Sequence, residues 1–411
     1  MPLLIYSSQK SSEKFDVFVS TSAIEKKIEE KTTIFSVPVK KITKFEELKR
    51  AQSNIDSALY QTPRALIVAL VSCLDAYLGD LLKSLFYLKP EILNSSERQL
   101  TFKQLVKFKD IDAAREYITE KEVESIIRES HAKQIKLIEQ KFDLPLTKDL
   151  DIWTSFIELT ERRNLFVHTD GIVSNQYLEV CRLHGVEVTN VSAGDRLSVS
   201  RSYFNDAYNC IYEFGVKLGI VLWRKIAPDE LEDADTTFLD ITFNLLKSGE
   251  YALSKKLFQF ATQLKKHGSN RLRRVFVINL AIACKWGGDA AEANKILDSE
   301  DWSDSASEFL LAVSVLKDKF VEAEAIMRQF PDSVNRSSYE SWPLFKEFRK
   351  TDNFLNAYKE IFGEDFEVEE KRTPEQEARK KELSEEKQSQ LETRSDEISP
   401  PDVPPQDIAQ K

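Results

Sequence analysis

The chain has 411 residues, enough for two or three domains that each bury a core. Its formal net charge is −10, and most of that negative charge lies in the segment from Glu364 to Lys411, so the rest of the chain is close to neutral. This distribution excludes the general basic surface typical of nucleic-acid-binding proteins, and any contact with RNA must come from a local patch.

The composition favours long helices. Hydrophobic residues make up 42% and charged residues 31% of the chain, with only 11 Gly and 13 Pro. A turn-rich β protein needs more glycine and proline than this, so the predicted fold class is all-α.

The sequence also predicts a cytoplasmic protein with no membrane association. The segment Met1–Lys14 lacks the basic and apolar regions of a signal peptide, and the apolar run Ala65–Leu74 is shorter than the roughly 20 residues of a membrane helix. The scattered cysteines include no CxxC pair, which indicates reduced thiols: Cys73, Cys181, Cys210 and Cys284. Cys73 is expected to be a small core residue.

Residues 1–45 are predicted to form an N-terminal extension with two β-like runs, Phe15–Ser20 and Thr33–Val39. A helical domain follows at residues 46–226. Thr62 and Pro63 are expected to begin a helix as N-cap and first helical residue, and this helix runs to about Leu88. Because Ala65–Leu74 is apolar on nearly all sides, we expect it at the centre of a bundle.

The next amphipathic helix is predicted from Leu150 to about Val167, with Asp149 as a candidate N-cap and Gly171 as a stop signal. Further elements are expected in chain order: helices within 102–142, a short helix at 174–183, a β-hairpin from 186–189 and 197–200, and a closing helix at 202–226.

Residues 228–235 are acidic and suggest a linker, after which the pattern changes. Small residues recur at Ser254, Ala293 and Ala323, each after a turn, at steps of 39 and 30 residues that bracket the period of a tetratricopeptide repeat. Residues 236–352 therefore resemble degenerate tetratricopeptide repeats, with generic helical hairpins as the alternative. Such repeats expose concave surfaces, so a protein partner is expected there. Residues 364–411 are predicted to be a disordered acidic tail.

The most informative motif is the end of the helix predicted around residue 160. Arg163 is followed by the polar Asn164, and His168 comes five positions after the arginine. This R-polar-x-x-x-H pattern, at the end of an amphipathic helix in an all-helical context, resembles the HEPN superfamily over residues 46–226. The continuation from Gly171 to Tyr177 looks like a branch common in microbial antiviral defence and toxin–antitoxin systems.

The resemblance implies a metal-independent endoribonuclease that needs no cofactor. In that family a homodimer forms a composite site, where the 2′-hydroxyl of the RNA attacks phosphorus and a 2′,3′-cyclic phosphate results. Histidine suits proton transfer near neutral pH, and arginine binds phosphate in a bidentate fork. Arg163, Asn164 and His168 are therefore the candidate catalytic residues.

The helix geometry supports parts of this assignment. Asn164 and His168 are four residues apart and share a face, so the amide is expected to orient the imidazole. Arg163 is rotated from His168 by about 140°, at 100° per residue, so two copies of the helix across a two-fold axis offer a natural way to surround one phosphate. Among the supporting candidates, Asp75 either orients Arg163 or is simply exposed, and Arg162 either contacts phosphate or is solvated.

Two alternatives stay open at the level of sequence. Arg163 and His168 can form a plain helix C-terminal cap, where positive charge is favoured. The domain can also be a non-catalytic scaffold or adaptor that uses the HEPN-like fold and the repeats for protein interaction.

Overall fold

The computed structural model describes residues 2–22, 24–29, 32–95, 99–148 and 150–366. It contains two compact units, Met1–Ser299 and Glu300–Lys411. Among the described residues the only named strands are those of one short β-hairpin, and helices dominate, which confirms the all-α class. Most of the predicted tail, from residue 367 on, lies outside the described residues, and so does Asp149, the candidate N-cap.

The α-helices of the first unit are α1 (Pro2–Thr21), α2 (Ile42–Leu88), α3 (Phe102–Leu105), α4 (Ile111–Ile127), α5 (His131–Phe142), α6 (Trp153–His168), α7 (Asn175–Leu183), α8 (Arg201–Ile226), α9 (Leu231–Lys247), α10 (Tyr251–Gln263), α11 (Asn270–Trp286) and α12 (Ala290–Asp298). Its strands are β1 (Glu25–Glu29) and β2 (Thr32–Ser36), which pair antiparallel. The second unit contains α13 (Ser307–Leu316), α14 (Phe320–Gln329), α15 (Arg336–Ser341) and α16 (Asp352–Phe362).

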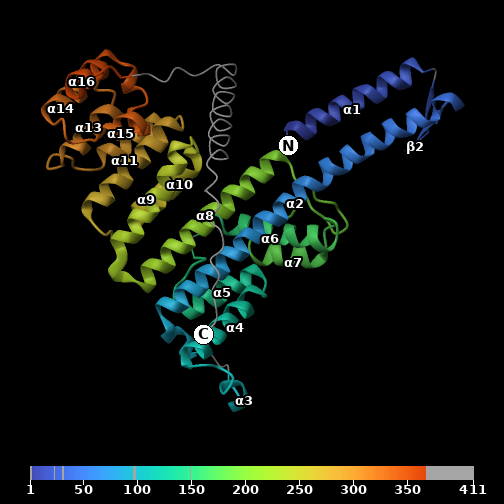
Figure 1. Ribbon diagram of the computed structural model, residues 1–411, viewed down its shortest axis with the longest axis horizontal. Helices are drawn as coiled ribbons and strands as arrows, with labels where there is room; N and C mark the ends of the chain where they lie inside the picture. Colours follow the sequence, from blue (N-terminus) through green and yellow to red (C-terminus); the bar gives the residue numbers. More distant parts are fainter. Residues whose placement is uncertain (1, 23, 30–31, 96–98, 149, 367–411) are drawn as a thin grey trace, which may run out of the picture. The chain divides into compact units, whose positions relative to one another are not determined.

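The N-terminal extension is mainly helical. The predicted β-like run Phe15–Ser20 is wrong, because it lies within α1, which runs along the first part of α2 (Figure 1). The ring of Phe15 packs 5.9 Å from Phe35 on β2 and 5.5 Å from Phe45 on α2. Packing between elements thus decides the local structure here. The second run, Thr33–Val39, is strand only as far as Ser36.

Helix α2 is longer than predicted. It begins at Ile42 and continues through Pro63, which is buried inside the helix, so the expected start at Thr62 and Pro63 is wrong. An internal proline removes one backbone hydrogen bond. The packing of α1 along the same helix accounts for its extension before Pro63.

One face of α2 is buried and another is exposed. Ile67, Val71 and Leu74 are buried, whereas Leu66 is 39% exposed and Cys73 is also exposed. The segment Ala65–Leu74 therefore lies in the core of the bundle as expected, but it is buried on one face only, and the expected burial of Cys73 is wrong. Of the described helices, only the segment Val39–Leu88 is long and apolar enough to cross a membrane by length and composition, a test that core helices of soluble proteins also pass.

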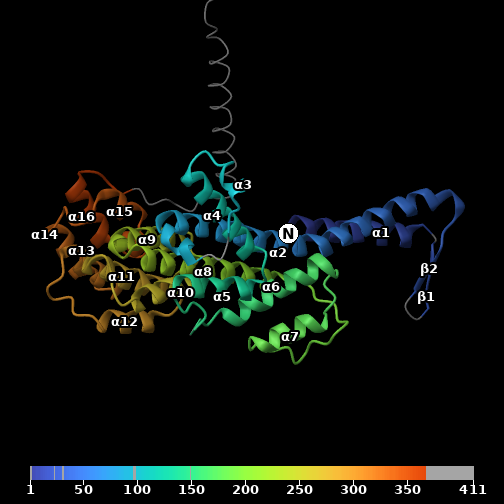
Figure 2. The same ribbon diagram turned by 90° about the horizontal axis from the view of Figure 1, so that it is seen from below.

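The core of the helical bundle forms where α2 packs against α4, α6 and α8. Phe156 of α6 is fully buried, and its ring stacks on that of Phe214 of α8 at 4.0 Å. Helix α6 in turn contacts α5 and α7, as Figure 2 shows. This packing fixes the helix that carries Arg163 and His168.

The elements after α6 follow the sequence prediction in part. Helices α7 and α8 match the predicted helices, and Ser174 caps α7 by accepting a hydrogen bond from the Tyr177 N–H. The predicted hairpin from 186–189 and 197–200 is wrong. The second segment instead meets the turn after α6, where the Leu197 N–H donates to the Gly171 carbonyl at 2.9 Å.

The predicted linker at 228–235 is also wrong, because α9 begins at Leu231 and Asp235 is fully buried. Arg224 forms an ion pair with this carboxylate, and the Gly268 N–H donates to it at 2.9 Å. Burial alone would raise the pKa of Asp235, but hydrogen bonds from His267 and Gly268 lower it below its usual value. Compensation of this charge lets an acidic stretch fold into a helix.

Helix pairs are present where repeats are predicted. Helices α9 and α10, and α11 and α12, pack against each other in the first unit, and α13 and α14 do so in the second. Ser254, Ala293 and Ala323 are buried on the second helix of each pair. The range 236–352 includes parts of both units, and its assignment to tetratricopeptide repeats stays a prediction.

Candidate functional site

The candidate site lies at the C-terminal end of α6. After His168 the chain leaves the helix through Asp170 and Gly171, which have φ values of +52° and +78°. The Gly171 N–H donates to the Leu165 carbonyl at 3.0 Å, which closes the last turn. A Cβ at Gly171 would lie 3.1 Å from the Leu197 carbonyl oxygen. Both the positive φ and this close approach favour glycine here, and the predicted stop is confirmed.

A buried arginine holds this turn in place. Arg64 of α2 donates through Nη1 to the backbone oxygen of Asp170 at 3.0 Å and to its carboxylate at 2.7 Å. Its Nη2 donates to the Leu197 carbonyl at 3.0 Å, and its guanidinium stacks on the Tyr60 ring at 3.6 Å. Arg64 thereby fixes the position of the chain directly after His168. Its role was not predicted from the sequence, although a lone charge at the start of an apolar run is a signal.

A cavity of about 540 Å³ opens beside the end of α6. We call it the α6 cavity. Its lining includes the ionisable and amide side chains of Asp75, His131, Glu161, Arg163, Asn164 and His168. His168 is exposed, and the side chain of Arg163 is 22% exposed. The structure thus brings the three candidate catalytic residues to one cavity that solvent can enter.

Arg163 is held by two neighbours. Its Nη2 donates to Asp75 Oδ2 at 3.2 Å, and its Nη1 donates to Asn164 Oδ1 at 3.2 Å. The sequence left open whether Asp75 orients Arg163 or is simply exposed. In the structure its carboxylate lies beside the Arg163 guanidinium. The expected role of Asn164 differs, since its hydrogen bonds join Arg163 and Glu161 rather than the His168 ring.

Two further ionisable groups in the α6 cavity were not singled out from the sequence. His131, at the start of α5, places Nε2 2.9 Å from Asp75 Oδ1. Burial raises the pKa of Glu161, an effect opposed by a hydrogen bond from Asn164 and by the nearby His131. The cavity is therefore a mixed cluster of acids and bases.

Arg162 lies outside the α6 cavity. Its Nε donates to Glu158 Oε1 at 2.6 Å, and its guanidinium stacks on the Tyr203 ring at 4.0 Å. The hydroxyls of Tyr177 and Tyr203 each donate to Glu158 at 2.8 Å. Neither suggested role, phosphate contact or free solvation, matches this position. Arg162 and Glu158 instead tie α6 to α7 and α8.

Two other polar side chains of this domain lie away from the α6 cavity or deep in the core. Tyr177 is 2% exposed and belongs to a small core cluster. Asp80 is exposed on α2 and does not line the α6 cavity. Within the described ranges, no group of three or more His, Cys, Asp or Glu side chains is arranged to hold a metal ion.

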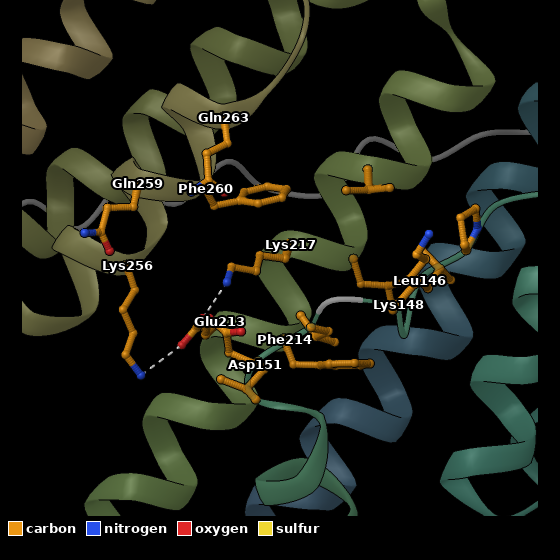
Figure 3. Close-up of a pocket in the computed structure, with 15 residues that line it drawn as sticks. Leu146, Lys148, Asp151, Glu213, Phe214, Lys217, Lys256, Gln259, Phe260 and Gln263 are labelled. Carbon is orange, nitrogen blue, oxygen red and sulfur yellow. Dashed lines mark hydrogen bonds and ion pairs between the residues drawn. The ribbon is translucent and has the colours of Figure 1, made fainter. Parts of the chain in front are cut away.

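A second cavity, of about 350 Å³, lies between α8, α10 and the segment before α6, and we call it the α8–α10 cavity. Figure 3 shows Lys217 and Lys256 approaching Glu213 from two helices. Glu213 is 3% exposed and lies 2.5 Å from the Lys217 ammonium and 3.4 Å from that of Lys256. Its charge is thus matched by lysines of the protein itself.

Comparison of the chain with protein-family models, curated proteins and solved structures found no match. The functional argument therefore rests on the geometry of the α6 cavity and on the sequence motif at the end of α6.

Proposed function

We propose that this protein is a metal-independent endoribonuclease of HEPN type that acts as a homodimer. One observation carries the proposal: Arg163, Asn164 and His168 line a single solvent-open cavity. These residue types are the ones that phosphodiester cleavage needs, since a guanidinium binds phosphate and an imidazole transfers protons near neutral pH. The fit of the motif to the HEPN pattern supports the same assignment.

In the proposed reaction a base removes the proton from the 2′-hydroxyl, and the 2′-oxygen attacks phosphorus. The bond from phosphorus to the 5′-oxygen breaks, and an acid protonates that leaving oxygen. The products are a 2′,3′-cyclic phosphate and a 5′-hydroxyl. Two copies of His168, one from each subunit, supply the proton transfers, and Arg163 stabilises the charge on the phosphorane.

We further propose that the enzyme works in the cytoplasm, without association with a membrane, in antiviral defence or in a toxin–antitoxin pair. Its helix pairs from α9 onward offer a surface for a protein partner, which fits a regulated toxin.

A non-catalytic scaffold is the second candidate, and a specific observation favours it. The Arg163 guanidinium is already paired with Asp75 and hydrogen-bonded to Asn164, so a phosphate has to compete with groups of the protein. The scaffold predicts normal dimerisation without cleavage of RNA.

The test uses full-length protein with total RNA in the presence of EDTA. We expect cleavage by the wild type and loss of cleavage in Arg163→Ala and His168→Ala. Matched controls are Arg182→Ala and His184→Gln, both on or next to α7 and outside the α6 cavity. Light scattering reports the oligomeric state. A dimeric wild type that leaves RNA intact would favour the scaffold.

A further inference from the structure

Asp75 contacts Arg163 through one carboxylate oxygen and a histidine through the other. This histidine is not part of the R-polar-x-x-x-H motif. His131 lies in the first turn of α5, 56 residues from Asp75 in the sequence, and its side chain is 6% exposed. Its Nε2 lies 2.9 Å from Asp75 Oδ1, while Asp75 Oδ2 accepts from Arg163 Nη2 at 3.2 Å. The two oxygens of one carboxylate are thus shared between an imidazole and a guanidinium.

The direction of the first hydrogen bond follows from the chemistry. An ionised carboxylate can only accept hydrogen bonds, so the Nε2 atom of His131 carries a hydrogen and donates a hydrogen bond to Asp75. A carboxylate held at both oxygens cannot rotate about its terminal torsion without losing one partner. His131 therefore fixes the plane in which Asp75 presents Oδ2 to Arg163.

Arg163 depends on this support. Its described hydrogen bonds run through Nη1 and Nη2, to Asn164 and Asp75, and its buried Nε has no hydrogen-bond partner among the described residues. Asn164 is its neighbour on the same helix and moves with it. Asp75 is thus the partner of Arg163 that lies on another helix, α2. His131 links this carboxylate to α5 through a second hydrogen bond.

Other charged groups face this arrangement. Glu161 of α6 lies near His131, and Glu129 and Arg128, just before α5, also line the α6 cavity. Glu129 is paired with Lys133, and Arg128 with Glu124. Among the described residues, Asp75 is thus the carboxylate that contacts both His131 and Arg163.

We infer that His131 is a positioning residue for Arg163: it holds Asp75 in the orientation that keeps the guanidinium in place for the phosphate. This inference rests on the proposed function, and it concerns a residue that touches neither the phosphate nor the reacting oxygens. Removal of such an indirect partner often lowers activity 10–100-fold, as is known for residues that orient the ligands of a metal ion.

The test compares His131→Gln with His131→Leu in the full-length protein. A glutamine amide nitrogen can donate in place of Nε2, whereas leucine cannot. We expect His131→Leu to lower kcat by about 10–100-fold with a smaller change in KM, and His131→Gln to stay within about threefold of wild type. His184→Gln, a histidine that packs on Trp153 outside the cavity, is the matched control and should leave both constants unchanged.

A double variant separates positioning from a general loss of structure. If His131 acts through Asp75, its replacement by leucine has little further effect in an Asp75→Ala background, because the two residues work as a unit. Independent, multiplying losses in the double variant would overturn the inference, as would a His131→Leu enzyme with wild-type kcat. Thermal unfolding of each variant reports whether the fold is retained.

A spectroscopic readout keeps the inference testable without catalysis. The side-chain Nε–H signal of Arg163 in a ¹⁵N spectrum should move in His131→Leu and stay near its wild-type position in His131→Gln. A wild type that does not cleave RNA refutes the proposed function, while the movement of this signal still decides whether His131 orients Arg163. An unmoved signal in folded His131→Leu contradicts the inference.

Discussion

The α6 cavity and the α8–α10 cavity both contain charged side chains, but these side chains differ in how deeply they are buried and how they are paired. In the α8–α10 cavity, Glu213 is almost fully buried and is compensated by two lysines of the same chain. In the α6 cavity, His168 is exposed, and the side chain of Arg163, which pairs with Asp75, is 22% exposed. The comparison teaches that a buried charge matched by partners of the same chain depends on those partners for the stability of the fold, whereas a partly open cluster can act on a ligand.

The largest expected effect concerns activity at the α6 cavity. His168→Ala should lower the rate of single-turnover RNA cleavage by about 10²–10⁴-fold, because a positioned proton-transfer group contributes that much. The melting temperature should stay near the wild-type value, since the His168 side chain is exposed. A His168→Ala enzyme of wild-type rate would remove the α6 cavity from the mechanism.

The next effect concerns stability at the α8–α10 cavity. Glu213→Ala leaves the mostly buried Lys217 ammonium without its close partner, and we expect a loss of about 3 kcal/mol in the free energy of unfolding, measured by denaturant titration. RNA cleavage by the folded fraction should not change. The paired replacement Glu213→Leu with Lys217→Met is the control, and it should cost far less because no unpaired charge remains. Equal costs for both would argue against charge compensation.

A smaller effect is expected in the turn after His168. Gly171→Ala should cost about 2 kcal/mol in unfolding free energy, because it combines a left-handed backbone with a close approach to the Leu197 carbonyl oxygen. Gly194 has a φ of +94°, but a Cβ added there would meet nothing within 4 Å, so Gly194→Ala should cost about 1 kcal/mol. Only Gly171→Ala should also slow RNA cleavage. Equal effects of the two variants would show that the close approach is unimportant.

The smallest effect depends on pH. Burial raises the pKa of Glu161 above its usual value of 4.5, so folding favours the protonated form of this carboxyl. The native protein therefore loses stability as pH rises from 4.5, the ordinary pKa of a glutamate, to the raised pKa of Glu161 in the native state. Well below pH 4.5, Glu161 is protonated in both the native and the unfolded protein. Glu161→Gln should raise the melting temperature slightly at pH 7 and leave it unchanged near pH 3. A gain at pH 3 that vanishes at pH 7 would contradict this sign.

Local signals in the sequence predicted part of the site. The predicted short helix at 174–183 matches α7, and Gly171 ends α6 as predicted, because helix boundaries and left-handed turns depend on nearby residues. The spacing of Arg163, Asn164 and His168 placed them on one helix end. These features depend on residues only a few positions apart.

The features that the sequence could not predict join distant segments. Arg64 reaches the turn at Asp170 across 106 residues, and His131 reaches Asp75 across 56. A local pattern can mark such a residue, as the lone charge marks Arg64, but it does not identify the distant partner. The acidic stretch at residues 228–235, which includes the start of α9, was misjudged for the same reason, since Arg224 and Gly268, which compensate Asp235, lie outside it.

The central claim is that Arg163 and His168 meet on one phosphate. The most direct measurement follows the ring signals of His168 and His184 by NMR while a 2′-O-methyl RNA oligonucleotide, which cannot be cleaved, is added. The account predicts that the His168 signal shifts on binding, that the His184 signal does not, and that Arg163→Ala abolishes the shift. Binding of the oligonucleotide with an unmoved His168 signal, or an equal shift in Arg163→Ala, would contradict it.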